Sequence, residues 1–368
     1  MLNSGNVYKY LDMCANGFWS CKKLLTYNRP IIVVTGSRSV GKSTGVACFA
    51  VLDYLVNGRK FFYLRRRPKT LQQTCKTFFT NAIQIINMRT PFNIIGFRYN
   101  RGDYEIGIEK TSDGEIAWKQ CGKAIALSEE ENYKSNVFSE YCTVIYDEFI
   151  SKDANKYLGT KDNPAVEWDA LVSLYQTIDR GVDHPFRDET RVFLLGNKST
   201  IYNPICLSIG IADYVREGAR YTAPKGQLWV WEDVDKVEKT AEMEKSFAFQ
   251  ISSDNVKEYA YHNKGADDTH FIRKPSVCKY INTVRLKGTE YGIHVDDGGL
   301  FYIGKPKEGY PIIALDVESH RCEDLFMIQK WRESPTLCLV AEAYKRGRLY
   351  FSDGKTQAAF MKYLEFMP

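Results

Sequence analysis

The sequence has no long apolar run. None of its hydrophobic stretches reaches the roughly 20 residues that a membrane-spanning helix needs, and its first residues lack the apolar segment of a secretory signal peptide. It also has no Cys-x-x-Cys pair, although ten cysteines are spread from Cys14 to Cys338. That scatter argues against zinc-binding and disulfide frameworks and is typical of a protein in a reducing cytoplasm. We therefore expect no membrane among its partners.

No charge of one sign dominates either. The formal net charge is +5, which permits a polyanionic partner but does not require one. A hydrophobic fraction of 44% and a charged fraction of 26% are those of a soluble globular protein. Because 368 residues exceed the length that one hydrophobic core usually serves, two domains are expected.

One stretch of the sequence carries a complete phosphate-binding pattern. Residues 36–43 match G-x-x-x-x-G-K-[ST] at every fixed position. A β-branched run over 31–35 precedes them, and apolar residues recur with helical spacing over 44–56. Strand, glycine-rich loop and helix is the context in which this pattern forms a phosphate cradle. The members of the predicted nucleotide site are Gly36, Ser37, Arg38, Ser39, Val40, Gly41, Lys42, Ser43 and Thr44.

The residue types in this loop predict binding of ATP with Mg2+. Gly36 and Gly41 let the backbone wrap closely around an anion, and the amides at the helix N-terminus point at it. Lys42 is expected to reach the β- and γ-phosphates. Ser43 is expected to hold Mg2+ through its hydroxyl.

A second pattern supplies the acids that such a site needs. An apolar and β-branched run over 141–146 ends in the adjacent carboxylates Asp147 and Glu148. Asp147 is predicted to ligate Mg2+, directly or through water. Glu148 falls on the other face of the strand end, where it can polarise an attacking water. The carboxylate doublet favours hydrolysis of a phosphoanhydride over transfer of phosphate to an acceptor.

Two further polar features have more than one interpretation. Asn197 follows a buried run over 191–195, and could sense the γ-phosphate or simply cap the next turn. A basic cluster flanks the apolar run over 61–64, and could be solvated, face DNA or contact a neighbouring subunit. We take this cluster as the first candidate for contact with DNA phosphates; its members are Arg65, Arg66, Arg67 and Lys69.

The order of predicted elements indicates an α/β fold followed by a smaller α+β domain. Hairpin signals over 94–127 predict an antiparallel insertion in a mostly parallel sheet. A charged segment over 232–245 is the best boundary, which divides the chain into a P-loop domain (1–230), a helical linker (231–248) and a C-terminal domain (249–368). Strands in 276–316 and helices over 335–345 and 356–366 are expected in the last.

Taken together, these stretches resemble the DNA-packaging ATPases of small protein-primed podoviruses, a branch of the phage terminase-like motors. The resembling stretches are 36–43, 61–66, 144–150, 170–180, 203–204 and 288–292, which span most of the chain. The resemblance implies an ASCE-type P-loop domain and a C-terminal domain similar to an RNase H-like nuclease without its activity. It implies a homomeric ring, usually a pentamer, on the portal of an empty capsid in the host cytoplasm. That ring drives double-stranded DNA inward with ATP, and use of a packaging RNA stays open.

The resemblance also implies roles for two arginines, alongside Glu148, in catalysis. Arg180 falls where the family has a trans-acting arginine finger, and Arg38 matches an arginine that terminase-like motors carry in the P-loop. Arg187, in the loop that follows, competes with Arg180 for the finger role. Arg180 could instead pair with Asp179 or Asp183 on a solvated loop.

Other functions are compatible with parts of this pattern. A working two-metal nuclease would need several acids that converge, whereas Asp296 and Asp297 look like an ordinary hairpin turn. A P-loop kinase is a second alternative, which the carboxylate doublet disfavours. A third is a nucleotide-switched assembly factor that moves nothing. The sequence discriminates poorly against it, because translocation is a property of the ring.

Overall fold

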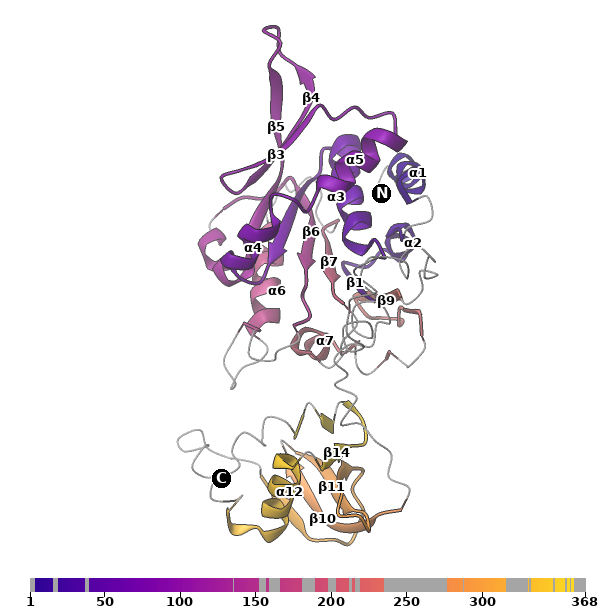
Figure 1. Ribbon diagram of the computed structural model, residues 1–368, viewed down its shortest axis with the longest axis vertical. Coiled ribbons are helices and arrows are strands. Elements are labelled where there is room, and N and C mark those ends of the chain that lie inside the picture. Colours follow the sequence, from indigo (N-terminus) through magenta and orange to yellow (C-terminus); the bar gives the residue numbers. More distant parts are fainter. Residues whose placement is uncertain are drawn as a thin grey trace, which may run out of the picture. The chain divides into compact units, whose positions relative to one another are not determined.

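A nine-stranded sheet organises one unit of the chain, residues 1–266, and a five-stranded sheet organises another, residues 267–368 (Figure 1). The computed structural model describes residues 4–15, 19–36, 40–134, 136–151, 157–158, 166–180, 189–197, 203–211, 214–215, 219–234, 277–286, 288–315, 330, 332–346, 348–354, 356–357 and 359–360. The predicted site residues Ser37, Arg38 and Ser39, and Arg187, lie outside the described residues.

The large sheet combines parallel and antiparallel parts. Its strands are β1 (Ile31–Gly36), β2 (Lys60–Arg65), β3 (Gly96–Asn100), β4 (Asp103–Lys110), β5 (Ile116–Ala126), β6 (Tyr141–Asp147), β7 (Arg191–Leu195), β8 (Tyr221–Thr222) and β9 (Trp229–Val234). Their order is β3-β4-β5-β2-β6-β7-β1-β9-β8, and the pairs from β5 through to β9 in this order are parallel. This confirms the predicted mostly parallel sheet. Strand β7 lies between β1, which precedes the P-loop, and β6, which ends in Asp147.

Helices cover both faces of this sheet because its central strands are apolar on both sides. The helices are α1 (Ser4–Ala15), α2 (Lys22–Thr26), α3 (Lys42–Asn57), α4 (Pro68–Thr74), α5 (Thr80–Arg89), the 3-10 helix η1 (Leu127–Tyr133), α6 (Val166–Asp179) and α7 (Pro204–Ser208). Along β2, Phe61 and Tyr63 join the core under α1, α3 and α5, whereas Phe62 and Leu64 join the core under α6 and α7. The alternation follows from the two-residue period of a strand.

The predicted antiparallel insertion is confirmed. Strands β3, β4 and β5 form a meander, and Figure 1 shows β4 and β5 extending past the helices as a long hairpin. Helices α4 and α5 are separated by a turn over 75–79. The Phe79 ring in that turn packs on the Phe61 and Tyr104 rings, with centroids 4.7 and 4.8 Å away. Burial of aromatic surface thus accompanies the break.

The smaller unit has the predicted α+β character. Its sheet has the order β13-β10-β11-β12-β14, formed by β10 (Lys279–Leu286), β11 (Thr289–Val295), β12 (Phe301–Gly304), β13 (Ile312–Ala314) and β14 (Leu349–Phe351). Helix α12 (Pro335–Lys345) contributes Leu337 and Val340 to its core. The predicted hairpin turn at Asp296 is present, since its carboxylate accepts a hydrogen bond from the Leu300 amide at 2.8 Å. The likeness to an RNase H fold stays a prediction.

The predicted domain boundary needs one correction. Strand β9 continues to Val234 and all six of its residues are buried, so 231–234 belong to the large sheet and not to a linker. The charges at Glu232 and Asp233 suggested a solvated segment, but Glu232 accepts a hydrogen bond from Trp19 and Asp233 one from Thr35. The rest of the predicted helical linker, 235–248, lies outside the described residues.

Within the part of the chain that the structure describes, we find no helix with the length and apolar character to cross a bilayer.

Candidate nucleotide site

The P-loop begins where β1 ends and finishes in the first turn of α3. Gly36 has φ +137°, and a Cβ there would lie 2.4 Å from the carbonyl oxygen of Val234 on β9. Gly41 has φ +91° and precedes the helix. Side chains are strained at such backbone angles, and at Gly36 there is also no room for one. These two glycines thus satisfy a steric requirement of the loop as well as the sequence pattern.

Lys42 and Ser43 start the helix that follows. Lys42 is buried, and its Nζ donates to the Gly36 carbonyl at 2.9 Å, so the side chain folds back over the loop. The Ser43 hydroxyl lies 3.3 Å from Oδ1 of Asp147 at the end of β6. The fold therefore brings the two predicted metal-binding side chains together. Thr44 follows in the same turn of α3.

Arg65 connects the two acids of the second motif. Its Nη1 donates to Asp147 and its Nη2 to Glu148, each at 2.7 Å. The cause is strand order: β2 pairs in parallel with β6, with Leu64 opposite Tyr146, so Arg65 ends its strand beside Asp147. Tyr63, two residues earlier on the same strand, directs its hydroxyl to Asp147 at 3.4 Å.

Glu148 has a backbone conformation that is unusual for a residue other than glycine. Its φ is +56°, in the left-handed region that L-residues seldom occupy. The next residue, Phe149, is held in place, because its amide donates to Leu195 and its carbonyl accepts from Arg66. The turn leaves the Glu148 side chain 57% exposed, whereas that of Asp147 is 14% exposed. One acid is thus mostly buried beside Ser43 and the other faces solvent, a division that suits a metal ligand and a group that orients water.

Burial raises the pKa of the Asp147 carboxyl, an effect that the Arg65 guanidinium opposes. A buried carboxylate without a positive partner would be costly. Arg65 therefore has an electrostatic role in the site, since it stabilises the charged form of Asp147 when no cation is bound.

The predicted DNA-contacting cluster requires correction. Arg65 is 6% exposed and belongs to the nucleotide site. Arg66 forms a bidentate ion pair with Glu167 on α6, at 2.7 and 2.9 Å, and lies over the Tyr157 ring. Both arginines are held inside the fold because the end of β2 lies between β5 and β6. Only Arg67 and Lys69 are exposed and stay candidates for a DNA contact.

Glu167 is the centre of a buried polar network. It is 0% exposed and also accepts hydrogen bonds from the Tyr146 hydroxyl at 2.6 Å and the Leu158 amide at 2.8 Å.

Because Glu167→Ala would leave the Arg66 charge unpaired, we expect it to lower the free energy of unfolding by about 3–5 kcal/mol. Urea denaturation measures this. Glu342→Ala, which removes an exposed i,i+4 pair with Arg346, is the control and should change stability little; equal effects of the two variants would contradict the prediction.

Two other predicted residues lie at opposite ends of the sheet. Asn197 follows β7, where the Gly196 amide donates to Val34 at 3.0 Å, so it is at the edge that carries the P-loop and Asp147. Arg180 follows α6 and is exposed, and its guanidinium donates to the carbonyls of Lys134 and Asn136, just before β6 begins. The γ-phosphate contact of Asn197 and the finger role of Arg180 stay predictions.

These features define a class of protein. An ASCE-type P-loop nucleoside triphosphatase is marked by a glycine-rich loop after one strand, two adjacent acids at the end of another and a strand inserted between the two. Here β1, β6 and β7 are these strands. The family model for the podovirus DNA encapsidation protein (Gp16) matches residues 13–365. The chain therefore belongs to the podovirus DNA encapsidation protein family, and the resemblance drawn from its motifs is confirmed.

Individual relatives agree with this assignment. The DNA packaging proteins of Bacillus phages PZA and phi29 are each 26% identical to the chain over 346 residues, which cover 91% of this chain and 93% of each relative. A chain of the bacteriophage phi29 genome packaging motor assembly superposes with a TM-score of 0.62 at 22% identity, over 94% of this chain and 99% of that one. A chain of the phi28 gp11 DNA packaging motor gives 0.59 at 18% identity, over 95% and 98%. At these identities the structures support the fold.

Proposed function

We propose that this protein hydrolyses ATP to drive double-stranded viral DNA into a procapsid, as a ring of identical subunits on the capsid portal in the host cytoplasm. Membership of a DNA encapsidation family supports the packaging part. The observation that carries the ATPase part is the junction of the two motifs, where Ser43 and Asp147 lie 3.3 Å apart. The family resemblance alone supports a ring of five subunits.

The donor set at this junction fits Mg2+. A hydroxyl and a carboxylate are hard oxygen ligands of the type that Mg2+ takes with nucleotide phosphates. When bound, the ion would neutralise part of the phosphate charge. Ser43 and Asp147 would hold it, and Lys42 would supply a further positive charge to the β- and γ-phosphates.

Glu148 is the residue that we assign to water. Its carboxylate is exposed on a turn whose backbone is fixed at Phe149, so it can orient a water at the γ-phosphate. Arg65 contacts both acids and is a positioning residue in this scheme. We do not expect nuclease activity from the second unit.

The proposal is tested by packaging itself. Purified protein, procapsids that carry their portal, genomic DNA and ATP should yield DNA that resists added nuclease, and ATP consumption should rise when DNA and procapsids are both present. Glu148→Gln protein is the control for motor-independent association. A protein that assembles on the portal yet protects no DNA would instead be an assembly factor.

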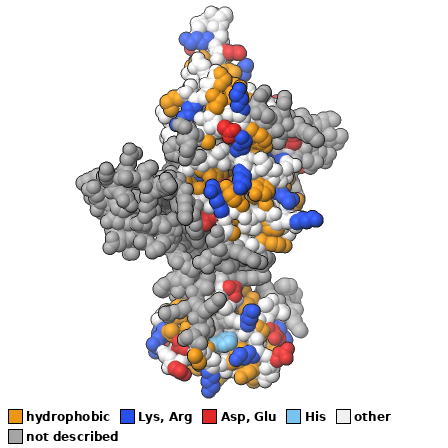
Figure 2. All heavy atoms as spheres, turned by 90° about the vertical axis from the view of Figure 1, so that its right-hand side faces the viewer, with side chains coloured by type: hydrophobic (Ala, Val, Ile, Leu, Met, Phe, Trp, Pro, Cys, Tyr) orange, Lys and Arg blue, Asp and Glu red, His pale blue; other side chains and the backbone are white. Residues whose placement is uncertain are grey.

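DNA should be held through its phosphates, because a packaging motor must accept any sequence. We expect affinity to fall steeply with salt. The double variant Arg67→Ala/Lys69→Ala should reduce the slope of log K against log salt by about 0.9 for each phosphate that the protein no longer neutralises. On the face that Figure 2 shows, the lysine and arginine side chains of the described residues are interspersed with side chains of other kinds.

Fluorescence anisotropy with several unrelated duplexes measures this slope, and Lys225→Ala, in the exposed turn before β9, is the control. An unchanged slope in the double variant would remove Arg67 and Lys69 from the DNA contact. A sequence preference that persists at high salt would overturn phosphate-based binding altogether.

A further inference from the structure

Trp19, between α1 and α2, links strand β9 to the P-loop. Its indole Nε1 donates to the Glu232 carboxylate of β9 at 2.8 Å, and its own amide donates to the Val40 carbonyl of the loop at 3.4 Å. Glu232 is 1% exposed and Val40 is 2% exposed. A single residue thus connects a buried acid of the sheet with the backbone of the phosphate loop.

The position of Trp19 is fixed from two sides. On one side, Glu232 holds the indole, and the same carboxylate accepts a hydrogen bond from Nε of Arg220 at 3.3 Å, which balances its charge. On the other side, Trp19 lies directly on α3. A Cβ at Gly45 would be 2.8 Å from the Trp19 carbonyl oxygen and 2.9 Å from its Cε3 atom. Glycine inside a helix is destabilising relative to alanine, and this close contact explains why it is present here.

The hydrogen bond to Val40 sets the direction of a donor in the phosphate cradle. A peptide group is planar and almost always trans, so its C=O and its N–H point in opposite directions. Because Trp19 binds the Val40 carbonyl, the N–H of Gly41 points away from Trp19. Gly41 directly precedes Lys42, at the start of α3, where backbone amides bind phosphate. Without the hydrogen bond this peptide could rotate, since Gly41 has φ +91° and no side chain to restrict it.

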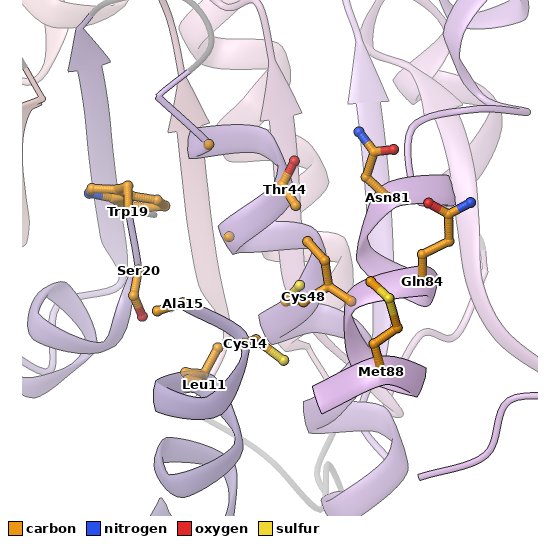
Figure 3. Close-up of a pocket in the computed structure, with 13 residues that line it drawn as sticks. Leu11, Cys14, Ala15, Trp19, Ser20, Thr44, Cys48, Asn81, Gln84 and Met88 are labelled. Atoms are coloured by element: carbon orange, nitrogen blue, oxygen red, sulfur yellow. The ribbon is translucent and has the colours of Figure 1, made fainter. Parts of the chain in front are cut away.

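The two ends of the loop are held in different ways. At its start the loop is closely packed, because a Cβ at Gly36 would lie 2.4 Å from the Val234 carbonyl oxygen. At its end, Gly41 and Trp19 line a cavity of about 490 Å³ beside α3 (Figure 3). Since open space borders Gly41 there, the orientation of its peptide depends on hydrogen bonds more than on packing.

We infer that Trp19 and Glu232 are positioning residues of the phosphate site. Glu232 holds Trp19, and Trp19 holds the Val40–Gly41 peptide with its N–H directed at bound phosphate. The inference rests on the proposed ATPase function and deepens it. It gives the acid of β9 an effect on phosphate binding that is exerted entirely through Trp19.

The test measures phosphate binding with and without a base. Calorimetry gives the affinities of inorganic tripolyphosphate and of ATP, each with Mg2+. Glu232→Met keeps the length of the side chain but removes the acceptor, and Trp19→Phe keeps a ring on α3 but removes the indole donor. We expect each variant to bind both ligands about ten-fold more weakly, as loss of one hydrogen bond to a charged group implies.

Two further variants show whether the two residues act through one hydrogen bond. The double variant Trp19→Phe/Glu232→Met should bind no more weakly than either single variant, because both remove the same interaction. Glu232→Gln keeps an oxygen that can accept from the indole, so it should bind both ligands nearly as well as the wild-type chain.

Two controls separate positioning from general damage. Tyr104→Phe removes a buried hydrogen bond to the Cys75 carbonyl at 2.9 Å in the same core, so it should lower stability and leave both affinities unchanged. Lys42→Ala should weaken both ligands; if it does not, the P-loop is not the phosphate site and the proposed function fails first. If Glu232→Met does not fold, Trp19→Phe decides, since it leaves the pair of Glu232 and Arg220 in place.

Four results would overturn the inference. They are unchanged affinity in Trp19→Phe or in folded Glu232→Met, losses that add up in the double variant, an equal loss in Tyr104→Phe, and a loss in Glu232→Gln as large as that in Glu232→Met. A loss confined to ATP would also overturn it, because the Gly41 amide can contact phosphate in both ligands.

Discussion

Glu148→Gln should lower ATP turnover by at least about a hundred-fold and leave ATP binding nearly intact, since positioned acid–base groups contribute about 10²–10⁴. Glutamine has the size of glutamate and keeps the turn that Phe149 anchors, but it cannot accept a proton from water. It also keeps an oxygen toward Arg65, so the arrangement around Asp147 should persist. Steady-state turnover and equilibrium nucleotide binding measure the two effects.

Lys42→Ala is the matched variant in the P-loop. It removes a buried cation that lies over the loop, so both binding and turnover should be lost. The contrast between the two variants identifies the role of each residue. Near-normal turnover in Glu148→Gln would show that another group orients the water.

The residues of the nucleotide site could be predicted wherever the chemistry is local in the sequence. Gly36, Lys42 and Ser43 form one loop, and Asp147 ends the strand that its apolar run predicted. In the second unit, α12 also has its predicted bounds, and a proline marks its start. In each case the signal and the structure involve neighbouring residues.

Arg65 and Arg66 could not be placed in the same way. Their partners depend on which strands lie beside β2, and a basic run at a strand end has the same appearance whether it faces DNA or buried acids. One signal was available: in a parallel sheet the carboxyl ends of neighbouring strands meet at one edge, so an arginine after β2 can reach acids after β6. Strand order decides whether it does, and the sequence alone does not supply that order.

The second large prediction is that Arg180 completes the active site of a neighbouring subunit. Its guanidinium contacts carbonyls just before β6 starts, whereas Asp147 is where β6 ends. The strand between these two points has 7 residues, which separates them by about 20 Å. Arg180 is thus too far away to reach the phosphates in its own subunit, and being exposed it is available to another.

An arginine supplied from outside can raise the rate of phosphoryl transfer by about a thousand-fold or more, because it neutralises charge that develops on the γ-phosphoryl oxygens. We therefore expect Arg180→Ala to reduce turnover by a similar factor in assembled rings without loss of ATP binding. Arg101→Ala, another exposed arginine, in the β3–β4 turn, should not. Arg187→Ala tests the competing candidate in the residues that follow α6.

Mixing decides whether the arginine acts in trans. An Arg180→Ala chain keeps its own Glu148, and a Glu148→Gln chain keeps its own Arg180. Where the first chain provides the nucleotide site with its Glu148 and the second provides Arg180, one complete site is restored. A mixture should therefore recover part of the turnover that each variant lacks alone. If mixed rings form, as labelled subunits can show, and turnover stays at the level of the single variants, Arg180 is a structural residue that holds the loop around Asn136. Recovery would mean that hydrolysis in one subunit depends on the position of the next, which gives a ring a physical means of hydrolysing ATP in successive subunits in order.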